Sequence, residues 1–308
     1  MKLNPINQAN RDNKLLPYLA LAVTVLATSV GGMFVRWANA PGIVTVFYRT
    51  AISTLLVAPF FVKNLVQNKR SLKSIAPWIP MAMLGGLMIA LDQASWASAL
   101  LMTKMANTTY FNSLAPLWVA LFALFVFKEK LKWIFWVGLA LALGGTLIIL
   151  GLDLIYRPHL GPGDLLGLVS SFFYGGYFLV TQNGRRNLDT LTYTWIATLS
   201  CAICLGLINI LFNQSIIGFP LESYLFFFGA AITSQVIGYF SLSYALGQLS
   251  ATIVSPTMLA KPITVALLAF IFFGESLTFG EIIGGILVLI GIFLINKNEL
   301  RLTKKPVG

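Results

Sequence analysis

Residues 116–145 read PLWVALFALFVFKEKLKWIFWVGLALALGG, and residues 262–291 read PITVALLAFIFFGESLTFGEIIGGILVLIG. The two stretches lie 146 positions apart and are identical at twelve positions, among them one proline, one glutamate and two glycines. The same offset carries Ala99-Leu100 onto Ala245-Leu246. Apolar helices match one another easily by chance, but shared Pro, Glu and Gly residues are not explained by hydrophobicity. The pattern therefore predicts an internal duplication.

The composition is typical of a protein that is surrounded by lipid. Of the 308 residues, 57% are hydrophobic and only 10% are charged, and the mean hydropathy is +0.83. Soluble domains carry about 25% charged residues, so this chain has too few charges to cover a surface that faces water. An ordinary cytosolic enzyme, a disordered chain and a nucleic-acid-binding module are excluded, and an integral membrane protein is predicted.

The apolar stretches are long enough for ten membrane-spanning helices. Each crossing needs about 20 largely apolar residues. Turn signals and charges separate the stretches, which run over residues 16–36, 42–62, 75–101, 106–127, 133–151, 164–182, 191–212, 222–245, 251–273 and 280–296. The third and the eighth exceed the minimum length, so we expect a tilt or a kink in each.

The distribution of basic residues predicts the orientation of these spans. With the N-terminus in the cytoplasm, sixteen of the 21 Lys and Arg residues fall in cytoplasmic segments and three in outer segments. The remaining two, Arg49 and Lys261, lie within spans. Such a bias indicates that both termini are cytoplasmic. It also accounts for the net charge of +11 without a nucleic-acid partner.

The duplication divides the chain into two halves of five helices each. Because five is odd, the second half enters the membrane from the opposite side. Inverted repeats of this kind are typical of secondary transporters, whose substrate site lies near the midplane between the halves. The expected organisation is a cytoplasmic N-terminal segment, a first repeat, an outer linker, a second repeat and a basic cytoplasmic tail, at residues 1–15, 16–151, 152–163, 164–296 and 297–308.

The repeated residues also resemble a known family. Ala99-Leu100, Pro116, the Lys128-Glu129-Lys130-Leu131 step and the Gly-rich helix after it resemble the EamA-type half of the drug/metabolite transporter superfamily. The second half carries the same pattern, with Gly274 where the first has Lys128. The resemblance implies a ten-helix carrier of small metabolites, commonly an exporter of the bacterial inner membrane. Members handle amino acids, nucleotide sugars, organic phosphates, quaternary amines and drugs, so the family does not name the cargo.

Three charged residues lie deep inside the predicted spans, away from their ends: Arg49, Asp92 and Lys261. Charges in the bilayer core are costly and usually functional. All three fall at middle to outer-middle depth, so they could share one cavity, and their sum of +1 favours an anionic or zwitterionic cargo. The structural alternative is an ion pair between Asp92 and either Arg49 or Lys261 that holds helices together.

Asp92 is the one carboxylate deep within a span, and two roles fit it. A protonatable Asp could couple proton movement to transport, or it could be a fixed counter-charge for Lys261 or for a substrate amine. Trp96 follows Asp92 by one helical turn, so the two share a face that could hold a cation by charge and by cation–π contact. Trp96 is otherwise an ordinary packing aromatic.

Uncharged polar residues complete the predicted substrate site, with inter-helix hydrogen bonding as the alternative for each. The repeat offset pairs Gln93 with Tyr239, whereas Asp92 pairs with Gly238. An acid in one half alone is expected when a symmetric scaffold binds an asymmetric ligand. The uncharged candidates are Gln93, Tyr110, Asn112, Tyr174, Tyr177, Gln235 and Tyr239.

A secondary transporter accounts best for the spans, the inverted repeat and the few midplane charges. The expected cargo is a small polar metabolite such as an amino acid, exported by alternating access, with lipid as solvent and protons as a candidate coupling ion. A membrane enzyme would need acid, His or metal-ligand clusters, but the chain has one histidine, His159, and no cofactor or metal site is predicted. A channel would need rings of like groups, and a receptor or scaffold remains the alternative if nothing is transported.

Overall fold

The computed structural model describes residues 15–67, 75–150, 160–274 and 276–302. The predicted N-terminal segment before residue 15, the outer linker up to residue 159 and the end of the basic tail lie outside the described residues. Within the described ranges the chain is helical and contains no strand. The all-helical fold expected from the sequence is thus confirmed for this part of the chain.

The helices follow the expected order in both halves. In the first half they are α1 (Leu16–Trp37), α2 (Gly42–Gln67), the 3₁₀ turn η2 (Ala76–Trp78), α4 (Ile79–Ala99), α5 (Met105–Asn112), α6 (Ala115–Phe125) and α7 (Trp133–Leu150). In the second half they are α9 (Pro162–Gly184), α10 (Thr190–Leu211), α11 (Leu221–Ala230), the π-helix η3 (Ala231–Tyr239), α12 (Phe240–Leu246), α13 (Ala251–Thr257), the 3₁₀ turn η4 (Met258–Ala260), α14 (Lys261–Phe273) and α15 (Phe279–Leu302).

Eight helical stretches among the described residues are long and apolar enough to cross a membrane, and a shorter apolar stretch covers Leu16–Gly31 in α1. The protein is therefore a multi-pass membrane protein. α4 is not among the eight, although it has 21 residues. Asp92 and Gln93 near its middle lower its hydropathy.

Helix breaks occur at equivalent places in the two halves. α5 ends at Asn112 and α6 begins at Ala115, directly before Pro116. In the second half, η4 separates α13 from α14 directly before Pro262. Proline has no N–H to donate and its ring clashes with the preceding turn, so each break lies at the N-terminal side of the proline. The eighth predicted span, residues 222–245, was expected to be tilted or kinked, and in the structure the π-helix η3 interrupts it.

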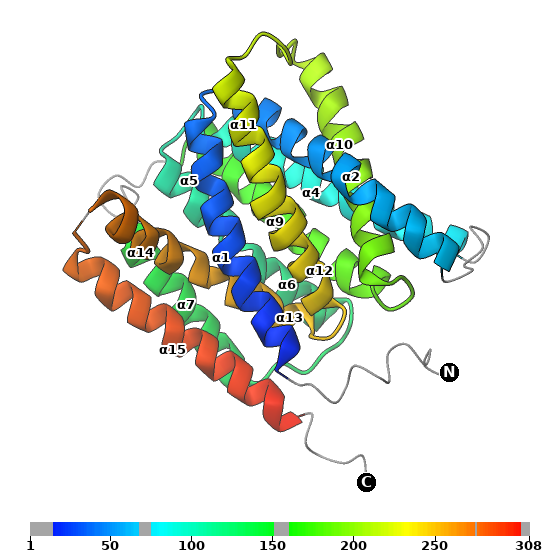
Figure 1. Cartoon of the computed structure of the whole chain (residues 1–308). Coiled ribbons are helices and arrows are strands. Elements are labelled where there is room, and N and C mark those ends of the chain that lie inside the picture. Colours follow the sequence, from blue (N-terminus) through cyan, green and yellow to red (C-terminus); the bar gives the residue numbers. More distant parts are fainter. Residues whose placement is uncertain (1–14, 68–74, 151–159, 275, 303–308) are drawn as a thin grey trace.

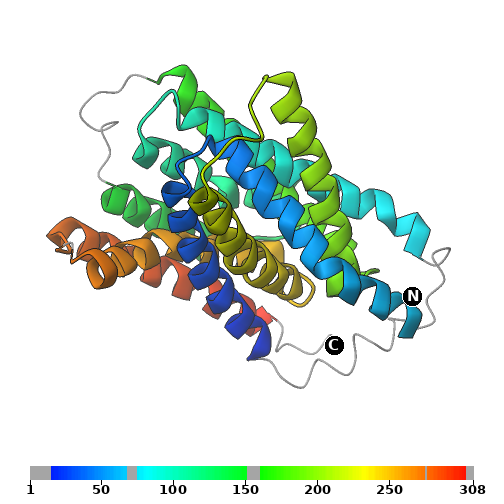
Figure 2. The same cartoon turned by 45° about the horizontal axis from the view of Figure 1, so that its top comes forward.

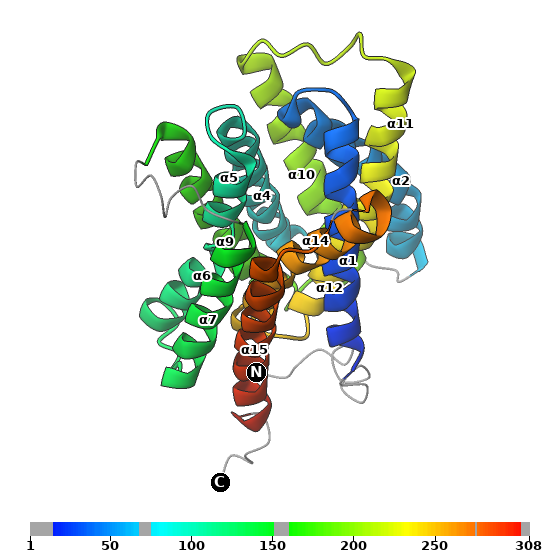
Figure 3. The same ribbon diagram turned by 90° about the vertical axis from the view of Figure 1, so that its left-hand side faces the viewer.

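The two-repeat architecture is visible in the contact between the two closing helices. α7 and α15 pack side by side along one edge of the molecule (Figures 1 and 3). A Cβ on Gly138 would lie 2.8 Å from the Gly291 carbonyl oxygen, and one on Gly145 would lie 2.4 Å from that of Gly284. The repeat offset converts the first pair into the second. The two helices therefore touch backbone to backbone through a two-fold contact, as small residues permit in membranes.

The halves are interleaved. α2 and α10 pack together, well away from the α7–α15 pair (Figure 2). Among the helices between these pairs, α1 of the first half packs against α11, η3, α12 and α14, while α9 of the second half packs against α4, α5 and α6. α1 begins and α15 ends on the same side of the molecule (Figure 1).

The one departure of the first repeat from the EamA pattern lies at a left-handed turn. Lys128 has φ 54° and its counterpart Gly274 has φ 65°. Glycine adopts this conformation freely, whereas a residue with a Cβ does so at a cost. The positive φ of this turn therefore explains why the pattern has glycine at this position. Lys128 adopts the same left-handed conformation although it carries a Cβ.

The α7–α15 contact gives a test with adjacent positions. We expect Gly145→Ala to destabilise the protein by about 1–3 kcal/mol, because the new methyl group would overlap the Gly284 carbonyl. Gly144→Ala is the matched control, because a Cβ there has no neighbour within 4 Å. The measurement is the melting temperature of each variant in detergent. Equal melting temperatures for the two variants would contradict the close helix contact.

Candidate functional site

A cluster of buried polar side chains lies where helices of both halves meet. α2, α4 and α5 contribute from the first half, and α9, η3 and α14 contribute from the second. Its members are Arg49, Asp92, Gln93, Asn112, Ser170, Tyr174, Tyr177, Ser234, Tyr239 and Lys261. The cluster brings together eight of the eleven residues predicted from the sequence.

Asp92 is held by neutral hydrogen-bond donors. Its side chain is 5% exposed. Its Oδ1 accepts one hydrogen bond from Nδ2 of Asn112 and one from Oγ of Ser170, both at 2.8 Å. Asn112 also donates to Ser170 at 2.5 Å, which closes a triangle among α4, α5 and α9. Among the described residues no ion pair joins Asp92 to Arg49 or Lys261, so the structural alternative of a helix-fixing ion pair is not what forms.

Arg49 is buried among neutral partners. One terminal nitrogen donates to Oε1 of Gln93 at 2.5 Å, and the other lies 3.5 Å from Oγ of Ser234. The guanidinium also lies over the ring of Tyr239, 5.8 Å from its centroid. Gln93 in turn donates to the Tyr239 hydroxyl at 3.5 Å. Arg49 is thus fixed to α4 and η3 without a carboxylate.

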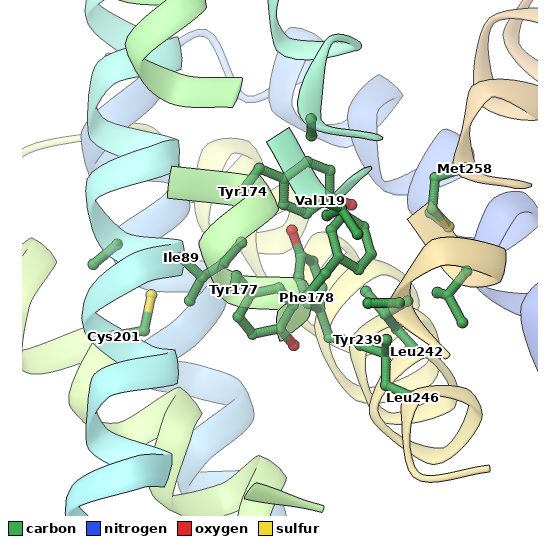
Figure 4. Packing of buried hydrophobic residues seen from close by; sticks show 14 of the residues in the cluster. Ile89, Val119, Tyr174, Tyr177, Phe178, Cys201, Tyr239, Leu242, Leu246 and Met258 are labelled. Atoms are coloured by element: carbon green, nitrogen blue, oxygen red, sulfur yellow. The ribbon is translucent and has the colours of Figure 1, made fainter. Parts of the chain in front are cut away.

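Lys261 lies at one end of a row of tyrosines. Its Nζ donates to the Tyr174 hydroxyl at 3.3 Å and lies 5.4 Å from the centroid of that ring. The Tyr174 ring is nearly parallel to that of Tyr177 at 6.4 Å, and Tyr177 meets Tyr239 edge to face at 6.0 Å. Figure 4 shows Tyr174, Tyr177 and Tyr239 close together within the apolar core. Aromatic side chains therefore connect the surroundings of Lys261 with those of Arg49.

The site straddles the internal two-fold relation. Gln93 and Tyr239 are equivalent positions of the two repeats, 146 residues apart, and they bond to each other. Equivalent residues can touch in this way only where the two repeats face one another across their symmetry relation. The site is therefore located between the repeats, where transporters with inverted repeats bind substrate.

Three predicted residues lie apart from these contacts. Trp96 is half-buried and packs against the apolar core, and the aromatic partners of Arg49 and Lys261 are tyrosines instead. Tyr110 places its ring 5.9 Å from that of Phe111. Gln235 donates to Thr198 at 3.4 Å and lines a small cavity among α2, α10 and η3.

Two members of the cluster were missed by the sequence reasoning. Ser170 is buried on α9, one turn before Tyr174 and two turns before Tyr177. That polar stripe at helical spacing could have revealed it. Ser234 faces Arg49 from the π-helix η3, and no feature of the sequence signals that helix.

The described residues contain no group of three His, Cys, Asp or Glu side chains that could hold a metal ion. The polar groups present are one carboxylate, two cations, amides, hydroxyls and phenols. These groups can bind carboxylate, amine and planar parts of a small molecule by charge, hydrogen bonding and stacking.

The fold defines a class: multi-pass helical membrane proteins built from two repeats. The sequence profile of the EamA-like transporter family matches residues 15–151 and 161–297. The chain therefore belongs to the EamA-like transporter family.

Named relatives are distant but span most of the chain. An uncharacterized transporter of Archaeoglobus fulgidus is 23% identical, over 91% of this chain and 97% of its own length. The pseudopaline exporter CntI of Pseudomonas aeruginosa is 23% identical, over 88% and 92%. A probable amino-acid metabolite efflux pump of Salmonella typhimurium is 24% identical, over 71% and 77%. One solved crystal structure superimposes with a TM-score of 0.76 at 19% identity, covering 93% of this chain and 98% of that chain, and so shares the fold.

The triangle around Asp92 can be tested by removing one donor. We expect Asn112→Leu to destabilise the protein by about 1–3 kcal/mol, because a buried carboxyl group loses a hydrogen bond. Thr109→Val is the control on the same helix, since the Thr109 side chain is half-buried and its hydroxyl donates only within the helix, to the Met105 carbonyl. Melting temperatures in detergent give the comparison. A loss no larger than that of the control would mean that Asn112 does not hold Asp92.

Proposed function

We propose that the protein is a secondary transporter that exports a small amino-acid-like metabolite across the plasma (inner) membrane by alternating access. The observation that carries this proposal is the buried cluster itself. It contains one carboxylate and two cations without an ion pair among them, and it draws its members from both halves. Charges left unpaired in the core of a membrane protein are expensive unless a ligand uses them.

Each group has a proposed role at the site. Lys261 and Arg49 bind the acidic group of the cargo, and Asp92 binds its amine or carries the coupling proton. Gln93, Asn112, Ser170 and the tyrosines orient the polar and planar parts. Trp96, Tyr110 and Gln235 are proposed to line the path to the site, because they lie on the same helices as members of the cluster.

The proposed topology has ten spans with both termini in the cytoplasm. α4 supplies the span that hydropathy alone omits, since 21 helical residues extend about 31 Å at 1.5 Å per residue. That length matches the hydrocarbon core of a bilayer. The positive-inside bias and the common side of the first and last helices support the placement of the termini.

Arg185 is proposed as a latch on the cytoplasmic side. From the end of α9, its Nε donates to the Ser243 carbonyl on α12 at 3.0 Å, and its terminal nitrogens donate to Thr190 and to the Leu188 carbonyl. Its equivalent in the first repeat is Asn39, which is exposed. The contact therefore closes one face of a two-fold scaffold without a counterpart on the other, as a gate in alternating access would.

The names of the relatives are consistent with this cargo class. One is called a probable amino-acid metabolite efflux pump and another a pseudopaline exporter. Export of a metabolite is therefore the direction proposed here.

The transport proposal is tested in proteoliposomes with a labelled metabolite panel, amino acids first. We expect wild type to move a cargo, and Asp92→Asn and Lys261→Met each to lower the initial rate about tenfold or more, equivalent to losing about 1.4 kcal/mol. Glu222→Gln and Lys297→Met are the matched controls, since both side chains are exposed. If an imposed pH gradient drives wild type but not Asp92→Asn, Asp92 is the coupling group.

Three results would contradict these assignments. Full activity of both charge variants would make Asp92 and Lys261 structural while the transporter proposal stands. Failure of wild type to move any member of a broad panel would favour a receptor or scaffold, and chemical conversion of a panel member would favour a membrane enzyme.

The latch is tested by accessibility. In a background that lacks Cys201 and Cys204, Ser243→Cys reports exposure of the buried centre of α12 to a membrane-impermeant maleimide. We expect Arg185→Gln to raise the labelling rate several-fold, because the bond to the Ser243 carbonyl is lost. Arg186→Gln is the control, since Arg186 is exposed. Equal labelling in both variants would exclude the latch.

A further inference from the structure

The Arg49 guanidinium is a buried cation without an anion. Its side chain is 8% exposed, and its partners Gln93, Ser234 and Tyr239 are all neutral. Its Nε has no hydrogen-bond partner among the described residues. A buried charge is costly unless it is both paired and hydrogen-bonded. Arg49 is hydrogen-bonded but not paired, and one of its donors remains free.

Asp92 does not serve as that counter-ion. Its Oδ1 is occupied by Asn112 and Ser170. The formal charges of Arg49, Asp92 and Lys261 sum to +1, and the hydrogen-bond partners of Arg49 among the described residues include no carboxylate.

The π-helix places two neutral hydroxyl-bearing side chains beside this cation. In an α-helix, residues five apart point about 140° away from each other. In a π-helix, whose hydrogen bonds join residues i and i+5, they fall on nearly the same side. Ser234 and Tyr239 are five apart in η3, and both approach Arg49. Ser234 is backed by Gly31 of α1, where a Cβ would lie only 2.4 Å from that of Ser234.

We infer that Arg49, Ser234 and Tyr239 form an anion subsite for a carboxylate, and that the transporter selects cargo of net charge −1 over neutral isosteres. This inference rests on the proposed function and narrows its substrate class to acidic amino acids and related monoanions. A monoanion brings the sum of Arg49, Asp92, Lys261 and cargo to zero, whereas a zwitterion leaves +1 in a medium of low dielectric constant.

The chemistry of the subsite favours a carboxylate over a phosphate. A guanidinium fork matches the planar carboxylate with two parallel hydrogen bonds. A phosphate dianion would leave the site at −1, and the ionised carboxylate of Asp92 would repel it. The hydroxyls of Ser234 and Tyr239 can donate further hydrogen bonds to the bound oxygen atoms.

Two pairs of amino acids test the charge directly, because each differs only by an oxygen replaced with an NH₂ group. Initial rates are measured in proteoliposomes for glutamate against glutamine and for aspartate against asparagine. We expect wild type to move the acidic member about tenfold faster or more, a ratio equivalent to about 1.4 kcal/mol. Binding to the purified protein by calorimetry should show the same order.

Variants of the subsite residues then test whether the preference for the acidic cargo arises at Arg49 and Ser234. We expect Arg49→Gln to bring the acid-to-amide ratio close to one, and Ser234→Ala to lower it by a smaller factor. Arg186→Gln is the matched control, because that arginine is exposed, and it should keep the wild-type ratio. Melting curves and size-exclusion profiles identify any variant that fails to fold. A ratio between two cargoes is also unaffected by the amount of active protein.

Three outcomes would overturn the inference. If wild type transports amino acids with no preference for the acidic member, the transporter proposal stands and the inference of charge selection is wrong. Arg49→Gln could lower both members of a pair by the same factor, which would make Arg49 a structural residue. If wild type moves neither pair, acidic amino acids are excluded as cargo, and the proposed function then depends on the rest of the metabolite panel.

Discussion

A charge surrounded by helices that face lipid must find its partners inside the protein. Arg49, Asp92 and Lys261 meet this constraint with neutral groups: amides and a serine around two of them, tyrosines beside both cations. Neutral partners make the charges tolerable without cancelling them. The rest of the structure is arranged around this cluster, since its members come from six helical elements of both halves.

The scaffold is symmetric, but the site is not. Gly138 with Gly291 and Gly145 with Gly284 repeat one backbone contact across the α7–α15 pair, so the internal two-fold relation is kept at the edge of the molecule. At the centre, Gln93 meets its own equivalent Tyr239, a different residue type. Symmetric packing at the edge gives the two repeats equivalent contacts. The asymmetric centre allows an asymmetric ligand to bind in one orientation.

Much of the site was predictable because charge in an apolar stretch is conspicuous. Arg49, Asp92 and Lys261 could be identified one by one from composition, and Tyr174 and Tyr177 from their helical spacing. Their partners were harder to predict, because hydrogen bonds between helices depend on rotation and register. Trp96 was expected to hold a cation since it shares a face with Asp92, yet tyrosines on other helices lie nearer to both cations. Gln235 was assigned to the centre, but it bonds to Thr198 instead.

The sequence by itself determined the membrane class, the duplication, the order of the helices and the three buried charges. These follow from hydropathy, from the 146-residue offset and from the energetic cost of charge in lipid, all of which are properties of the chain read in order. The tertiary structure decided which charges are left unpaired and what surrounds them. Ser234 reaches Arg49 because η3 is wound as a π-helix, and Asp92 avoids both cations because Asn112 and Ser170 converge on it from two other helices. Such contacts depend on how helices from opposite ends of the chain pack, which no local pattern of residues specifies.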